Sequence, residues 1–295
     1  MAKEKTSYMA KDRDRFADVV THIEANLDEE IDLDKLCQHA NLSKFHFHRQ
    51  CSIYFGISVM ALVRVLKLKR AAFQLAYRGD KIINIAIENG YESHEAFSRA
   101  FKKHFDKSPY EFRKKPDWTP WQTIYEPVLT LRVKNMNADS DCKVELIDFP
   151  ETSIAVLEHR GAPNLLINTI QKFIQWRKFN HLPPRISKTF NLVYDDPSST
   201  ESEDYRFDIC CSTPHAIDAN EYGVINKTIP AGKCAVVRHI GSDDTIGEVV
   251  NFLYSRWLEN SCFELRNFPL FFERVSLFPD VPEGEMITDI YLPIA

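Results

Sequence analysis

The sequence predicts two domains: an all-α domain with tandem helix-turn-helix motifs over residues 1–115, and an α+β domain of two strand-helix-strand-strand repeats over residues 143–295. Three observations lead to this prediction. A chain of 295 residues is long enough for two domains. A short helical pattern around Ser43 recurs around Ser93, and a longer pattern repeats from residue 143 at an offset of 80 residues.

Apolar spacing and capping residues predict the first helices. Residues 13–27 place apolar side chains at helical spacing. Asp32 is suited to cap a short helix after them. Ser43 is suited to cap the next helix, which runs to Phe55 and ends at Gly56.

A long helix is predicted to separate the two motifs. It begins at Ser58 and ends at Gly79, which is roughly 20 residues or about 30 Å. The motif then repeats as a short helix over residues 82–88, a turn, and a helix from Ser93 to Phe105. A final helical turn opens at Ser108-Pro109, because proline suits the first helical position.

Charge is distributed unevenly along the chain. Residues 44–115 carry 15 Lys/Arg and 6 Asp/Glu, whereas residues 119–295 carry 16 Lys/Arg and 25 Asp/Glu. This asymmetry favours a polyanion-binding module fused to something else, although two ordinary solvated surfaces would give the same counts. With no long apolar run and no apolar signal core, we expect a cytoplasmic protein without a membrane span.

The residues around the second motif carry a family resemblance. Residues 85–113 read IAIENGYESHEAFSRAFKKHFDKSPYEFR. This run resembles the signature of AraC/XylS-family transcription regulators, and the resemblance covers residues 12–115. It implies homeodomain-like helix-turn-helix motifs that bind double-stranded promoter DNA. A helix of about 30 Å could hold two recognition helices at the spacing of about 34 Å between successive grooves on one face of B-DNA.

The resemblance also implies which side chains face the DNA. The implied base-reading residues are Phe45, His48 and Arg49 in the first motif, and His94, Glu95, Ala96 and Arg99 in the second. Arginine bonded to guanine is the commonest specific contact. The implied phosphate contacts are Lys44, Lys102, Lys103 and Arg113. The alternative for each exposed arginine is an ordinary solvated charge.

Residues 116–142 are interpreted as a linker, with an extended piece from Thr123 to Val133. The first repeat that follows is expected to form strands over residues 152–158, 190–194 and 205–212 and a helix over residues 165–179. The second repeat is expected to form strands over residues 233–239, 270–275 and 286–292 and a helix over residues 245–258.

The second repeat carries its own resemblance. The runs AGKCAVVRHIG (231–241), PLFFERV (269–275) and DIYLPI (289–294) resemble the gyrase-inhibitor-like effector-binding domain. The resemblance implies a small, often cationic and amphipathic, effector and a central carboxylate, here Glu273. Because aromatic faces attract cations, Trp257 and Tyr291 are further candidate ligand-binding residues. A buried carboxylate needs a partner. That partner could be the ligand, or Arg274 or Arg206 in a purely structural role.

The order of the two domains resembles the Rob-type subgroup of the AraC/XylS family. The interpretation is a transcriptional activator that is not an enzyme, with a small-molecule effector and RNA polymerase as further partners. We expect no cofactor, no metal site and no catalytic residue. Two alternatives stay open: a regulator whose second domain binds only a protein, and a small-molecule hydrolase fused to a DNA-binding module.

Overall fold

The computed structural model describes residues 2–136, 142–197 and 199–295. The chain divides into two compact units. Unit 1 comprises residues 1–137 together with the loops 242–245 and 278–284. Unit 2 comprises residues 138–241, 246–277 and 285–295. Two loops from the second half of the sequence therefore belong to the N-terminal unit.

Unit 1 is helical, as the sequence predicts. Its helices are α1 (Ala2–Ala25), α2 (Leu33–His39), α3 (Lys44–Phe55), α4 (Val59–Tyr77), α5 (Ile82–Glu88), α6 (His94–Phe105), α7 (Pro109–Lys114) and α8 (Thr119–Asn135), with the 3-10 turn η2 (Asp243–Thr245). The predicted caps are confirmed: Ser43, Ser58 and Ser93 each accept a hydrogen bond from the backbone N–H three residues on.

The expected extended piece from Thr123 to Val133 is wrong, because helix α8 occupies these residues. Pro120 lies in the first helical turn, where a missing N–H costs nothing. Trp121, Tyr125 and Val128 are buried and lie three or four positions apart, which is one stripe of a helix. The buried stripe outweighs the effect of Pro127, which lies inside the helix.

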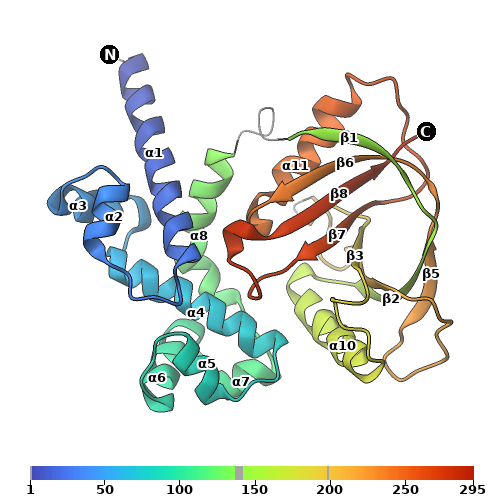
Figure 1. The fold of residues 1–295 in the computed structure, drawn as a ribbon, viewed down its shortest axis with the longest axis horizontal. Helices are drawn as coiled ribbons and strands as arrows, with labels where there is room; N and C mark the ends of the chain where they lie inside the picture. The colour runs from blue at the N-terminus through green and yellow to red at the C-terminus, as the bar shows by residue number, and fades with distance from the viewer. Residues whose placement is uncertain (1, 137–141, 198) are drawn as a thin grey trace. The chain divides into compact units, whose positions relative to one another are not determined.

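Helix α4 forms the centre of unit 1 and lies between the two helix-turn-helix motifs (Figure 1). Most of its side chains are buried, including Leu62, Leu66 and Leu68. A helix that is apolar on nearly every side is a core helix. In the described part of the chain no single helix passes a length-and-hydropathy test for a membrane span; α3 and α4 pass it only as a pair bent by 51°.

The described strands of unit 2 form one eight-stranded sheet. They are β1 (Val144–Phe149), β2 (Thr152–Arg160), β3 (Thr189–Val193), β4 (Arg206–Ser212), β5 (Ile225–Ile229), β6 (Gly232–Ile240), β7 (Leu270–Ser276) and β8 (Ile287–Pro293). Their spatial order is β1-β6-β8-β7-β3-β4-β2-β5, and the pairs are antiparallel. If β1–β4 are exchanged with β5–β8, the same order results when it is read from the other end of the sheet. The centre of this symmetry lies between β3 and β7.

Each half of unit 2 contains one strand more than the sequence analysis predicts. Strands β1 and β5 were missed, and each pairs with the second strand of the other half. Both lie at the edges of the sheet, and each has only one buried residue. An edge strand with a mostly exposed surface lacks the apolar alternation by which a strand is recognised in sequence.

The sheet has two different faces because successive side chains of a strand point to opposite sides. On one face, Leu157 and Ile209 pack against Phe173 and Trp176 of helix α10 (Leu166–Phe179), which follows the turn η1 (Pro163–Leu165). On the other face, an aromatic cluster gathers near the centre of the sheet.

The expected second helix is partly confirmed. Helix α11 (Ile246–Phe252) is followed by a π-helical segment, η3 (Leu253–Leu258). The turn η4 (Glu283–Glu285) precedes β8.

Candidate functional site

Helices α3 and α6 present equivalent outward faces. Their inner faces are fixed by apolar side chains at helical spacing, among them Phe47 in α3 and Phe97 and Phe101 in α6, each with no exposed surface. The opposite faces carry the sequence-predicted base-reading residues. Phe45, His48, Arg49, His94, Glu95 and Arg99 are exposed, and Ala96 is half-buried.

Arg49 and Arg99 are exposed on these outward faces. Within the described ranges neither guanidinium forms an ion pair with a protein carboxylate. Phe45 is 71% exposed, which is unusual for an aromatic ring in a folded domain. These properties suit contacts with a groove of DNA, where arginine bonds guanine and an apolar side chain contacts a thymine methyl group.

Buried polar contacts from α4 hold the second motif in place. The Arg70 guanidinium donates to the Asn89 side chain at 3.0 Å and to the Glu88 carbonyl at 2.7 Å. The Gln74 side chain donates to the Glu88 carboxylate and accepts from the Asn89 amide. Since buried polar groups must be paired, these contacts fix the turn between α5 and α6 relative to α4. The sequence analysis missed Arg70 and Gln74, which lie on a helix that it read only for apolar spacing.

The four predicted phosphate contacts differ in their surroundings. Lys102 and Lys103 are exposed in the last turn of α6. Lys44 forms an ion pair with Asp34, with Nζ and Oδ1 2.5 Å apart. Arg113 is half-buried and donates to the Asp80 carbonyl at 2.7 Å, and burial lowers its pKa. The geometry therefore favours the two lysines of α6 for contacts with a polyanion.

Glu273 lies on β7, on the face of the sheet opposite α10. Its side chain is 11% exposed and forms an ion pair with Lys188, with Oε1 and Nζ 2.8 Å apart. The Tyr291 hydroxyl donates to its other oxygen at 3.2 Å. Burial, and then the nearby Glu273 carboxylate, raise the pKa of Tyr291, so its phenol stays a neutral donor.

The two structural partners considered for Glu273 bond elsewhere. Arg274 follows Glu273 in the strand and donates to the Asn191 side chain at 3.0 Å and to Thr288 at 3.2 Å. Arg206 pairs with Asp195. The partner is Lys188, which the sequence analysis missed. Lys188 precedes β3, and only the pairing of β3 with β7 brings it to Glu273.

Aromatic rings pack against Tyr291, which is the hydrogen-bond partner of Glu273. The Tyr291 ring stacks on Phe271 with centroids 4.8 Å apart, and Phe149 meets both rings edge-on at 5.0–5.2 Å. Trp257 belongs to another ring pair, in which it stacks on Phe263 at 6.1 Å. Its role in ligand binding stays a prediction.

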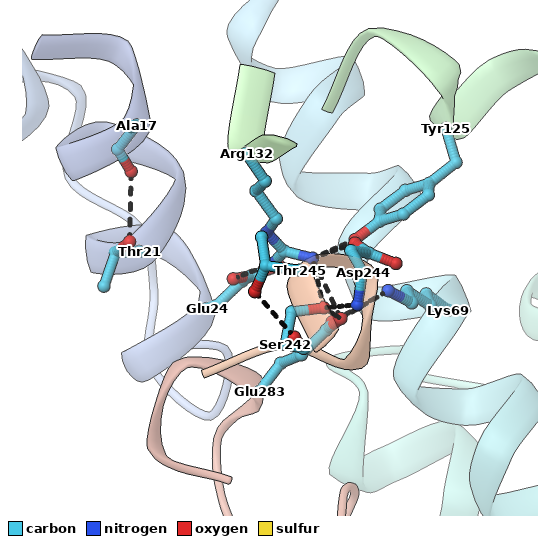
Figure 2. A network of polar contacts seen from close by, with 10 residues as sticks. All are labelled: Ala17, Thr21, Glu24, Lys69, Tyr125, Arg132, Ser242, Asp244, Thr245 and Glu283. Carbon is cyan, nitrogen blue, oxygen red and sulfur yellow. Dashed lines mark hydrogen bonds and ion pairs between the residues drawn. The ribbon is translucent and has the colours of Figure 1, made fainter. Parts of the chain in front are cut away.

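Unit 1 also contains a buried network of charges that the sequence analysis missed. Figure 2 shows Arg132 of α8 reaching Glu24 of α1 and, on the two loops of unit 1, Asp244 and Glu283. Glu283 forms a second ion pair with Lys69 of α4 at 2.8 Å. Three carboxylates thus surround two cations.

The pKa values of the two most deeply buried carboxylates in this network are shifted in opposite directions. Burial, with Glu283 nearby, raises the pKa of Glu24 to about 7 even though Arg132 opposes the shift. Burial acts in the same direction on Glu283, but Lys69 and Arg132 outweigh it and lower the pKa of Glu283 to about 2. The network therefore holds one proton more easily than an isolated glutamate would.

A tandem helix-turn-helix unit joined to a sheet with a buried carboxylate defines a DNA-binding regulator with a small-molecule-binding domain. Comparison with known families agrees. A helix-turn-helix domain family matches residues 36–115, and the family described as GyrI-like small molecule binding domain matches residues 143–295.

Two curated relatives each cover one of the two domains. The probable transcriptional regulator YgiV of Escherichia coli K12 is 41% identical over 153 residues, which cover 52% of this chain and 96% of YgiV. The right origin-binding protein of the same organism is 31% identical over 102 residues, which cover 35% of each chain. A solved EcmrR–DNA complex shows 15% identity and a TM-score of 0.44, covering 89% of this chain and 98% of that one.

The chain belongs to the GyrI-like small-molecule-binding domain family, and an AraC-type helix-turn-helix domain precedes that domain. The helix-turn-helix region is similar to the transcriptional regulator Rob of Salmonella typhimurium, which is 30% identical over 102 residues, 35% of each chain.

Proposed function

We propose that this regulator is a transcriptional activator that reads promoter DNA with α3 and α6 and responds to a cationic, amphipathic small molecule bound at Glu273. RNA polymerase is the proposed protein partner at the promoter. The DNA-reading part is supported above all by the exposed Arg49 and Arg99, which occupy equivalent positions on the outward faces of two equally capped helices.

The proposed effector chemistry is supported by the surroundings of Glu273. The carboxylate is nearly buried, and aromatic rings lie beside it. A ligand with a cationic head and an apolar body would complement both features. The alternative is a small-molecule hydrolase in which Glu273 and Tyr291 are catalytic. The relatives named as transcriptional regulators support the proposal that the chain is not an enzyme.

Selection of binding sites from random DNA tests the role of Arg99. The Arg99→Ala variant should lose preference at one or two base positions, since a bidentate contact with guanine contributes about 1–3 kcal/mol of discrimination. Lys103→Ala is the matched control, because it removes an exposed charge of the same helix. The control should weaken binding to all sequences alike. A uniform loss in Arg99→Ala as well would make Arg99 a phosphate contact.

A further inference from the structure

Three buried carboxylates lie on the same face of the sheet, and two of them are firmly held. Asp208 of β4 has no exposed surface and accepts from Arg160 and Lys227, each at 2.7 Å. It also accepts from the Tyr194 hydroxyl at 2.9 Å. A buried carboxylate held by several donors is costly to strip of its partners.

Asp289 of β8 is held by one arginine through two bonds. Both of its oxygens accept from Arg238 at 2.7 Å in a bidentate pair. Asp289 lies directly opposite Glu273 in the antiparallel register of β7 and β8. Like charges at directly opposite positions repel each other. Each of these two carboxylates therefore needs its own cation, and Arg238 satisfies only Asp289.

Glu273 has a much looser counterion than its neighbours. The backbone N–H of Lys188 is fixed by a bond to the Ser212 hydroxyl at 2.9 Å. The Lys188 side chain is 63% exposed, close to the 57% of Arg238, but it meets Glu273 through a single ammonium contact, whereas Arg238 holds Asp289 through two bonds. An ion pair with an exposed lysine contributes little to stability, because water screens it and a long side chain must be ordered to make it. Of the three carboxylates, Glu273 can be released at the smallest cost.

We propose that Lys188 is a built-in counterion that occupies Glu273 in the free protein and that a cationic effector displaces. This inference rests on the proposed binding of a cation at Glu273. The ammonium group of Lys188 and the cationic head of an effector compete for the same oxygen, Oε1. The Tyr291 hydroxyl keeps its bond to Oε2, so the carboxylate keeps its orientation during the exchange.

Lys188 would then set both the affinity and the charge selectivity of the site. With Lys188 in place, a neutral ligand leaves the ion pair intact and does not gain from the carboxylate. The binding free energy that a cation gains from the Glu273 carboxylate is reduced by the cost of displacing Lys188. Removal of the lysine should thus strengthen the binding of cations and leave the binding of neutral amphiphiles unchanged.

The test is isothermal titration of the full chain with dodecyltrimethylammonium, below its micelle concentration, and with an uncharged amphiphile of the same chain length. Lys188→Met keeps the length of the side chain and removes its charge. We expect it to bind the cation about two- to fivefold more tightly than wild type, the range that an exposed ion pair supports. Binding of the uncharged amphiphile should not change.

Lys143→Met is the matched control. Lys143 is also in unit 2, is 85% exposed and pairs with Glu145, so its loss changes the net charge equally. Cation affinity in Lys188→Met equal to or below that of Lys143→Met would overturn the role of Lys188.

Glu273→Gln separates this inference from the proposed function. If Glu273→Gln abolishes the preference for the cation while Lys188→Met behaves like wild type, the effector site stands and the built-in counterion is wrong. If Glu273→Gln binds the cation as wild type does, or if no variant binds it, both the effector site and the counterion are rejected.

Discussion

At the scale of single residues, two carboxylates that are buried to a similar depth differ in pKa because the charges around them differ. Burial, with Glu283 adding to the effect, raises the pKa of Glu24 to about 7 against the opposing charges of Arg132 and Lys69. Glu283 faces both cations of the network, and its pKa is lowered to about 2. An elevated pKa in the folded state means that folding favours the protonated carboxyl.

Stability should therefore depend on pH through Glu24. The pKa of Glu24 in the folded protein, about 7, exceeds the ordinary value of 4.5. The protonated carboxyl therefore stabilises the fold fully below pH 4.5, and this stabilisation is lost as pH rises toward 7. Replacement of Glu24 by Gln should remove this loss, and the stability of the variant relative to wild type should rise between pH 5 and pH 8 by about 2–3 kcal/mol. Urea unfolding followed by the helical circular dichroism signal measures this.

The exposed Glu29 offers a control, since Glu29→Gln should leave the pH profile as in wild type. A constant difference between Glu24→Gln and wild type across the same pH range would show that Glu24 is ionised in the folded protein throughout.

Sequence reasoning succeeded for residues whose partners are close in the chain. Ser93 and the serines equivalent to it were found because a cap and the backbone that it bonds are three residues apart. Lys188 and Arg132 were missed because their partners are 85 and more than 100 residues away. The identity of an ion-pair partner is a property of the tertiary structure, and a single sequence does not contain it in readable form.

At the scale of elements, the ends of the recognition helices were predicted more accurately than the edge strands. Helix α6 begins and ends where its cap and its apolar pattern indicate. Strands β1 and β5 have few buried side chains and were missed. The symmetric order of the sheet depends on these two strands. The internal repeat was therefore visible in the sequence, whereas the strand order was not.

The cap of α6 provides a test at this scale. The Ser93 hydroxyl accepts from the Ala96 N–H at 3.1 Å. Ser93→Ala should lower the free energy of unfolding by about 1 kcal/mol, whereas Ser93→Asp should retain most of it, because aspartate caps as well as serine. Chemical denaturation of both variants gives the comparison. Equal losses in the two variants would mean that the hydroxyl acts through other contacts.

At the scale of the whole molecule, the compact units do not follow the order of the sequence. The family match places residues 143–295 in one domain, yet the loops 242–245 and 278–284 are part of unit 1. These loops supply Asp244 and Glu283 to Arg132, and Glu283 also to Lys69. The N-terminal unit therefore depends on residues near the other end of the chain.

A fragment of residues 1–137 should consequently be less stable than the same helices in the full chain, by about 3 kcal/mol or more. Loss of Glu283 and Asp244 leaves Lys69 without its ion-pair partner and Arg132 with Glu24 alone, and unpaired buried charges are strongly destabilising. Adding Lys69→Met to the fragment should recover part of the loss, while the same change should destabilise the full chain. Urea midpoints measure both, and equal effects of Lys69→Met in fragment and full chain would contradict the dependence.

This arrangement has a consequence for synthesis. A ribosome that has completed residue 137 must still add the chain up to residue 284 before unit 1 has all its segments. At translation speeds of about 5–20 residues per second, this takes roughly 7–30 s. During that interval the nascent helices have buried cations but not all the carboxylates that neutralise them. The DNA-reading unit should therefore mature only when the effector domain is nearly complete.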